Sequence, residues 1–596
     1  MPILLALLLA AVVAACDGGG SGGSSPPPGG GTSTQNPCAT AALEPGAQRS
    51  SAASVELARE KKGAIDGDAR WRVLDALALH RQSARAPRQP LQAAGRDAQD
   101  AGEIAVIQDT GDLIVPPNLF DLRNTGVRFS PSGSGYEVRR IDGAFRTTLG
   151  AALTLTDDDS AQVNVPFPFS FYGRAQQDAF VNSDGNITFE SEDKASTERN
   201  VARLMTGPPR VSPFLTDLDP AAGGRVFVHA AADQYTVTWC GVRAFESTRV
   251  TTVQATLLPD GTVELKFGEP INIPDAVVGL SPGRTGAFAP IDFSATQPVT
   301  IAAAAGERFA QRAQLDTVAL TRRFYQTHPD NYDQLVVWTD QVLTVSAFAY
   351  EVTVANEISG IGLDRFDLSG DFGSAGRLRS LAVMDFLGKY PDDPAARFLG
   401  ENSTLSVLGQ EVGHRWLAFF DFLNHRRERS DALLGRSRSH WSFFLDSDAS
   451  VMEGNDIEDL GGGSFRTIDA VRRYSLLDQY AMGLVGEHEV PRFFYVESPA
   501  NAVPFRSRDS SPQIGVTFNG TRRDVLIQDV VAVHGRRLPP ASESARIHRQ
   551  AFIYVAGAGR DVQAAQIEKL NTIRTMWEGF FRDATDGRMR AETRLR

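Results

Sequence analysis

Three residues in one short segment of the sequence have the types and the spacing of a metal site. The segment is "LGQEVGHRW", and it contains Gln410, Glu411 and His414. Apolar residues recur through it at helical period, at positions 405, 408, 412, 416, 419 and 423, which predicts a helix from 405 to 423 with Ser403 or Thr404 as its N-cap. Residues 410 and 414 then lie one turn apart on one face. Two such side chains can hold one ion, while the glutamate beside them reaches a water molecule.

The glutamine is the weak point of this site. In the motif H-E-x-x-H both ends are histidines that bind Zn²⁺, an ion that strongly favours imidazole over an amide oxygen. Changes that touch only the surroundings of a ligand already cost about 10- to 100-fold in affinity or activity. We therefore expect Zn²⁺ as a weakly bound cofactor and low or absent hydrolysis. Glu411 is kept as the candidate general base.

A zinc site needs a third protein ligand. His440 is the first candidate and Glu453 the second, because the two share one face if "HWSFFLD" and "SVMEGN" pair as a hairpin. Asp446 and Asp448 lie between them and are further candidates. Met482, in "QYAMGL", is the candidate for a floor beneath the metal; the alternative is a core methionine on a helix.

The start of the chain predicts export and a lipid anchor. Residues 2–15 form an apolar run of signal-peptide length that is too short to span a bilayer comfortably. The run ends in "VVAAC", which resembles the lipobox of bacterial lipoproteins. The resemblance implies that residues 1–16 are a lipoprotein signal peptide, that Cys16 is lipidated, and that the protein is anchored to a membrane of the bacterial cell envelope. The alternative is an ordinary cleaved signal with a chance cysteine.

The remaining chain divides by composition into four stretches. Gly, Ser and Pro dominate residues 17–40, which predicts a disordered tether. Helical apolar spacing in residues 41–102 indicates a helical spacer or a pro-segment. Short β-branched and aromatic runs between turn signals predict an all-β sandwich over 103–300, with a hairpin at "AFVNSDGNITFE" in which Gly185 takes a positive φ. Residues 308–596 predict an α+β domain, with a helix over 376–391.

The all-β stretch resembles a known extracellular module. Five ordered blocks between residues 165 and 283 are similar to the nidogen-like β domain: "VPFPFSFYG", "AFVNSDGNITF", "SPFLTDLDPAAGGRVFV", "YTVTWCGV" and "VQATLLPDGTVELKFG". The resemblance implies an interaction module with an extracellular protein partner, and no catalysis.

The last stretch resembles bacterial zincin-like metallopeptidases. In those proteins the helix is H-E-x-G-H-R-W, and segments like "GRSRSHWSFFLDSDASVMEGN" and "RYSLLDQYAMGL" follow it. The resemblance covers about 315–494 and implies peptide-bond hydrolysis by a metal-activated water, with Glu411 as base, on a protein or peptide substrate. The alternative is a non-catalytic surface binding or adhesion protein on a degenerate peptidase scaffold.

Composition excludes one class of partner and leaves one pairing open. The chain has 60 Lys and Arg against 72 Asp and Glu, a net charge of −12, and no basic stripe interleaved with aromatics, so nucleic acid is not expected to bind. Cys38 and Cys240 are too few for a disulfide framework. Whether the two pair is open from the sequence.

Overall fold

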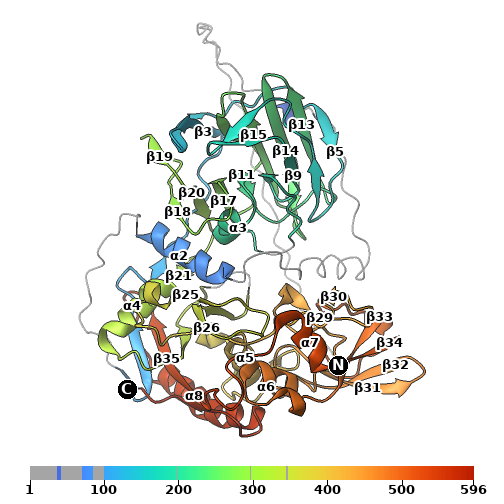
Figure 1. Ribbon diagram of the computed structural model, residues 1–596. Helices are drawn as coiled ribbons and strands as arrows, with labels where there is room; N and C mark the ends of the chain where they lie inside the picture. The colour runs from blue at the N-terminus through green and yellow to red at the C-terminus, as the bar shows by residue number, and fades with distance from the viewer. Residues whose placement is uncertain are drawn as a thin grey trace, which may run out of the picture.

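The computed structural model describes residues 36–39, 41, 70–84, 100–195, 198–295, 297–343 and 347–595. Strand outweighs helix, at 37% against 18% of residues, so the protein is mostly β. Figure 1 shows two halves, with a large β structure in the upper half and most of the helices in the lower one. Cys16, the signal peptide and most of the tether and spacer lie outside the described residues. None of the described helices is long and apolar enough to cross a membrane.

The upper half is a sandwich of two sheets around one apolar core. The larger sheet has the order β19 (Val299–Ile301), β4 (Gly135–Asp142), β3 (Thr125–Ser132), β16 (Val263–Phe267), β15 (Val250–Leu257), β14 (Gln234–Ala244), β13 (Arg225–Ala231) and β5 (Ala151–Leu153), with β12 (Leu218–Asp219) on β14. The other has the order β18 (Phe288–Pro290), β20 (Ala304–Phe309), β17 (Ala276–Ser281), β11 (Arg210–Leu215), β10 (Asn186–Phe189), β9 (Ala179–Asn182) and β6 (Ser160–Gln162). A ribbon of β7 (Phe169–Phe171) and β8 (Arg174–Gln176) and the helix α3 (Val201–Thr206) complete this half.

The predicted hairpin in the sandwich is confirmed. β9 and β10 pair with Asn182 opposite Asn186, and Gly185 between them has φ of +67°. A Cβ at this position would come within 2.2 Å of the carbonyl oxygen of Phe214. Glycine is therefore required both for its conformation and for the close approach of β11.

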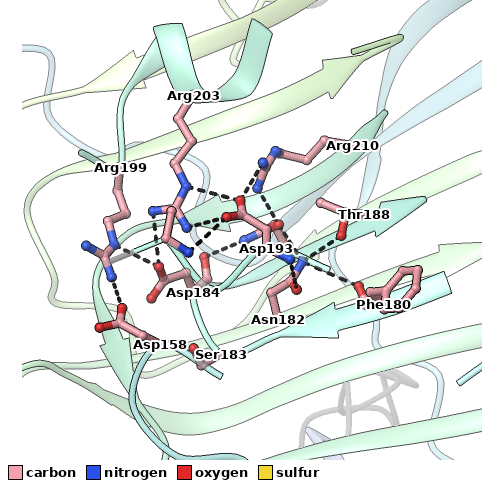
Figure 2. A network of polar contacts seen from close by, with 12 residues as sticks. Asp158, Phe180, Asn182, Ser183, Asp184, Thr188, Asp193, Arg199, Arg203 and Arg210 are labelled. Carbon is pink, nitrogen blue, oxygen red and sulfur yellow. Dashed lines mark hydrogen bonds and ion pairs between the residues drawn. The ribbon is translucent and has the colours of Figure 1, made fainter. Parts of the chain in front are cut away.

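A buried chain of alternating charges fastens the segment around α3 to this hairpin (Figure 2). Arg199 Nε lies 2.7 Å from Asp184, and Arg203 Nη2 lies 2.9 Å from Asp193. Buried charges are stable only when they are paired, and here each one is matched. The network runs in the order Asp158, Arg199, Asp184, Arg203, Asp193 and Arg210.

The lower half is built on a mixed sheet between helices. Its order is β1 (Ile104–Gln108), β35 (Ile547–Ala556), β22 (Gln334–Thr339), β26 (Ser380–Phe386) and β23 (Tyr350–Thr353), with β36 (Arg590–Glu592) on β35. β23 runs antiparallel to β26 at the edge, and the four strands before it are parallel. One face packs on α5 (Thr404–Gly413) and α8 (Ala564–Ala584), and the other on α2 (Trp71–Ser83) and α4 (Thr317–Thr327). In Figure 1, α2 lies between the two halves.

Smaller elements surround this sheet. A second sheet has the order β31 (Asn455–Gly461), β32 (Ser464–Ala470), β34 (Thr517–Val525) and β33 (Phe493–Val503). Short pairs join β2 (Ile114–Val115) to β21 (Gln314–Leu315), β24 (Ala355–Asn356) to β25 (Phe366–Asp367), β27 (Arg397–Leu399) to β28 (Asn402–Ser403), and β29 (Phe422–Leu423) to β30 (Arg429–Ser430). The helices α6 (Leu476–Met482) and α7 (Ile527–His534) and the 3₁₀ turns η1 (Pro37–Ala39), η2 (Ser369–Phe372), η3 (Leu387–Lys389), η4 (Arg436–Arg438) and η5 (Glu487–Glu489) complete the described elements.

Two helix predictions were wrong. Residues 380–386 form strand β26, which is buried on both faces, and such a strand gives an unbroken apolar run that periodicity cannot distinguish from a helix. The helix predicted for 405–423 ends at Gly413. The apolar residues beyond it, among them Trp416, Leu417 and Phe420, are buried in the core from an irregular segment.

The two cysteines that the sequence left open form a disulfide. Cys38 in η1 is bonded to Cys240 in β14, across a sequence separation of 202 residues, with a Cα–Cα distance of 5.3 Å. Phe145 and Phe227 pack around the pair. The disulfide fastens the described part of the N-terminal stretch to the centre of the larger sheet.

Candidate functional site

Helix α5 presents the predicted site residues inside the lower half. Ser403 caps its N-terminus by accepting a hydrogen bond from the backbone N–H of Ser406, as the sequence predicted for Ser403 or Thr404. All residues of the helix are buried, and its apolar side packs on the sheet and on α8. His414 follows directly as the C-cap residue. Gln410, Glu411 and His414 are therefore held on a rigid, fully packed element.

His414 and His440 come together, although 26 residues separate them in the sequence. Their ring centroids are 4.9 Å apart, and the rings are nearly perpendicular. Nδ1 of His414 lies 3.1 Å from the carbonyl oxygen of Leu417, and Nδ1 of His440 lies 2.7 Å from that of Arg436. Each Nδ1 must donate to its carbonyl, so each Nε2 carries the free lone pair, which is the arrangement that orients histidine ligands in metal sites.

Both imidazoles are neutral because they are buried. Burial lowers the pKa of His414 well below its usual range, and the neighbouring His440 lowers it further. Burial also lowers the pKa of His440, with the nearby guanidinium of Arg436 acting in the same direction. Neutral imidazole is the form that binds a metal ion.

Gln410 is turned toward His440. Its side-chain nitrogen lies 3.1 Å from Nε2 of His440 and donates to that lone pair. A half-turn of the amide would exchange its nitrogen and oxygen and present the oxygen in the same place. Gln410 therefore occupies the position of a third ligand, and in the present arrangement it blocks one of the two imidazole lone pairs.

Glu411 places a nearly uncharged carboxyl beside this group. Its side chain is 3% exposed, and Oε2 has no hydrogen-bond partner among the described residues. Burial raises the pKa of Glu411 to about 8, against a partial offset from the guanidinium of Arg72. Oε1 accepts from the side-chain nitrogen of Gln410 at 3.5 Å. A buried carboxyl with one unsatisfied oxygen is costly for folding and is characteristic of functional sites.

The other residues predicted for the metal site lie away from the two histidines or are held in other contacts. Residues 440–454 form turns instead of the predicted hairpin, and Glu453 is buried in an ion pair with Arg436. Asp446 accepts from the backbone of Ile457, and Asp448 is exposed. Met482 is a buried core residue of α6. The methionine against the site helix is Met452, whose sulfur would lie 2.5 Å from a Cβ at Gly413.

A cleft at the edge of the sheet opens onto the site. It has a volume of about 350 Å³ and is lined by residues that include His414, Glu351 on β23, and Trp71 and Arg72 on α2. Burial raises the pKa of Glu351 to about 7. Glu351 was not predicted from the sequence, although a glutamate inside the apolar run "FAYEVTVAN" was a signal for it. Nothing in the sequence pointed to Arg72.

One acidic cluster lies in the sandwich. Within the described part of the chain, the only three His, Cys, Asp or Glu side chains whose ligand atoms lie within 4.8 Å of one another are Asp157, Asp158 and Asp217. Arg199 forms ion pairs with two of them, at 3.3 Å from Asp217 and closer to Asp158. A metal ion at the two histidines would therefore need Gln410 as its third protein ligand.

Comparison with known families identifies one part of the chain. Residues 135–325 match the model of a family described as NIDO related, a range that begins in β4 and ends in α4. The match confirms the nidogen-like domain that the sequence blocks predicted. Comparisons with curated proteins and with solved structures found no match.

Proposed function

We propose that this protein is an exported, lipid-anchored metallopeptidase-like protein whose site binds a divalent ion weakly and hydrolyses peptide bonds at a rate limited by Gln410. One observation carries the proposal. His414 and His440 are neutral, are fixed through Nδ1 by backbone carbonyls, and lie near Glu411, whose Oε1 accepts from Gln410 and whose Oε2 has no partner among the described residues. Structural packing alone does not require two oriented imidazoles beside a buried carboxyl with an unsatisfied oxygen.

The donor set fits a divalent ion incompletely. Nε2 of His414 and of His440 are suitable ligands for Zn²⁺, and a turned Gln410 adds an amide oxygen. A bound ion would act as a Lewis acid and lower the pKa of a water molecule. A bound cation would also favour the ionised form of Glu411, and in that form Glu411 can accept a proton from the water molecule and donate it to a leaving amine.

A non-catalytic binding role is the second candidate, and one contact favours it. The amide of Gln410 donates to His440 at 3.1 Å, which satisfies both groups without any ion. With this hydrogen bond the lower half can be stable without a metal ion and can serve only to support the neighbouring NIDO-related module. In that case the extracellular protein partner binds the sandwich, and the lower half supports it.

Metal content and proteolysis decide between the two candidates. The full chain is expected to bind less than one zinc per molecule after dialysis at micromolar zinc, and to cleave casein slowly. Gln410→His is expected to bind one zinc and to cleave faster by at least 10-fold, because it restores the third imidazole. Glu411→Gln in the same background keeps the metal and loses the activity. If Gln410→His gains neither zinc nor activity, the metallopeptidase proposal is wrong.

The anchor is tested separately. Cys16→Ser is expected to move the protein from the membrane fraction to the soluble fraction. The variant lacks the residue that would carry the acyl chains, and stable attachment needs two chains or more. Equal partitioning of the variant and the wild type would contradict a lipid anchor at Cys16.

A further inference from the structure

The first turn of α2 stands in the cleft of the candidate site. Trp71 and Arg72 line the cavity together with His414 and Glu351. Nη1 of Arg72 donates to the backbone carbonyl of Glu351 at 3.1 Å. The guanidinium also lies 4.9 Å from the centroid of the Trp71 ring, within cation–π distance. A guanidinium group thus has an acceptor and an aromatic face at this place.

The groups around the guanidinium of Arg72 stabilise a positive charge at this place. Glu351 is 3% exposed, and its carboxyl accepts hydrogen bonds from the hydroxyl of Thr353, at 2.8 and 3.0 Å, and from that of Ser380. A planar cation with several donors is therefore stabilised at this place by the backbone carbonyl of Glu351, by the Trp71 ring and by an interaction with the Glu351 carboxyl.

The position of α2 does not depend on the contacts of Arg72. Val73, Leu74, Leu77 and Ala78 are buried between the sheet of the lower half and α3. Further along α2, His80 and Ser83 bind the carboxylate of Asp316 at 2.9 Å. The helix is therefore held along its length, and its first turn delivers Arg72 to the cleft.

We propose that the cleft contains a subsite for a guanidinium group, which Arg72 fills in the resting chain and which an arginine side chain of a bound peptide fills when Arg72 is withdrawn. The proposal names the substrate class of the proposed peptidase site and in that respect rests on the proposed function. The subsite itself requires neither a metal ion nor hydrolysis. Arg72 acts as a competitor that is always present, because its attachment through the folded helix gives it an effective concentration at or above the millimolar range.

Ligand binding to the metal-free full chain tests the subsite. The probe is agmatine, a small guanidinium compound, titrated by calorimetry into wild type and Arg72→Ala in the presence of a chelator. Arg72→Ala is expected to bind agmatine at least 10-fold more tightly than wild type. Arg81→Ala, which removes an exposed arginine of the same helix, is expected to bind as wild type does. Arg72→Met keeps the apolar stem and serves as the second variant if the alanine disturbs α2.

Cadaverine separates a guanidinium subsite from a general attraction for positive charge. It carries ammonium groups, which are more strongly hydrated and lack the planar set of donors. Arg72→Ala is expected to prefer agmatine over cadaverine by at least 5-fold. Equal affinities for the two amines, or no gain over wild type in either Arg72 variant, overturn the subsite.

An activity assay keeps the two proposals distinguishable. Arg72→Ala is assayed with zinc on a peptide that contains arginine and on a matched peptide that contains lysine. Faster cleavage of the arginine peptide supports both proposals. Tighter agmatine binding without cleavage upholds the subsite and counts against the peptidase, while cleavage without any gain in agmatine binding upholds the peptidase and overturns the subsite.

Discussion

Gly413 shows at the residue scale how closely the candidate site is packed. A Cβ there would lie 2.5 Å from the sulfur of Met452 and 3.1 Å from the ring of Tyr474. Gly413→Ala is therefore expected to lower the free energy of unfolding by about 0–2 kcal/mol, because overpacking costs about 1–3 kcal/mol and better helix propensity returns about 1. The control is Gly579→Ala in α8, where a Cβ meets nothing within 4 Å. It should be neutral or stabilising by up to about 1 kcal/mol, and chemical denaturation measures both; equal effects would contradict the packing argument.

The carboxyl of Glu411 predicts a particular dependence of stability on pH. Its pKa rises from 4.5 to about 8 on folding, chiefly through burial. Between these values the folded metal-free chain retains a proton that the unfolded chain has released, so stability falls as pH rises through this window. Glu411→Gln removes the effect. The unfolding free energy of the variant minus that of the wild type should grow by about 1.4 kcal/mol per pH unit from pH 5 to 8 and level off above. A difference that is constant with pH would show that the carboxyl titrates normally.

At the scale of elements, η1 depends on its covalent bond to β14. The disulfide between Cys38 and Cys240 closes a loop of 202 residues, and cross-links of this kind contribute about 2–4 kcal/mol by limiting the unfolded chain. The double variant Cys38→Ser/Cys240→Ser is expected to lose that amount in chemical denaturation. Dithiothreitol should lower the stability of the wild type to the level of the variant and leave the variant unchanged. A reductant effect of equal size on both proteins would contradict this assignment.

The local sequence pattern correctly predicted the elements that depend only on residues close to them in the sequence. The hairpin around Gly185 and the start of α5 at Ser403 depend on neighbouring residues alone, and both appear as expected. β26 is buried on both faces, so its sequence lacks the alternation that marks a strand. The irregular segment after Gly413 keeps a helical spacing of apolar residues, but the surrounding core sets its path.

The candidate site was predictable to the extent that it lies within one helix. The spacing of 410, 411 and 414 fixed their common face, and His440 was chosen as the first partner outside the helix. The structure brings His440 to His414, through a turn and not through the hairpin that motivated the choice. Arg72 and Glu351 reach the cleft from remote elements, and no local rule links residues separated by hundreds of positions.

At the scale of the whole molecule, the sandwich is inserted into the lower half. β1 precedes the sandwich in the chain but lies in the sheet of the lower half, parallel to β35. β2 and β21, which flank the sandwich in the sequence, pair with Ile114 opposite Leu315. The chain thus leaves the lower half and returns to it at adjacent points. Inserted domains with neighbouring ends of this kind can be removed without breaking the host.

Two truncated chains test this arrangement. Replacing residues 117–312 by an Asn-Gly turn is expected to leave a folded, monomeric lower half, because β1, α2 and the β2–β21 pair are all kept. The loss of the α3 surface should expose part of α2 and cost some stability. A fragment of residues 308–596 lacks β1 and α2, leaves an edge of β35 unpaired, and is expected to aggregate. Size-exclusion chromatography and circular dichroism measure both. A soluble, folded 308–596 fragment would show that β1 and α2 are dispensable and that the sandwich and the lower half are successive domains. An aggregated turn-linked chain would show that the lower half needs the sandwich in order to fold.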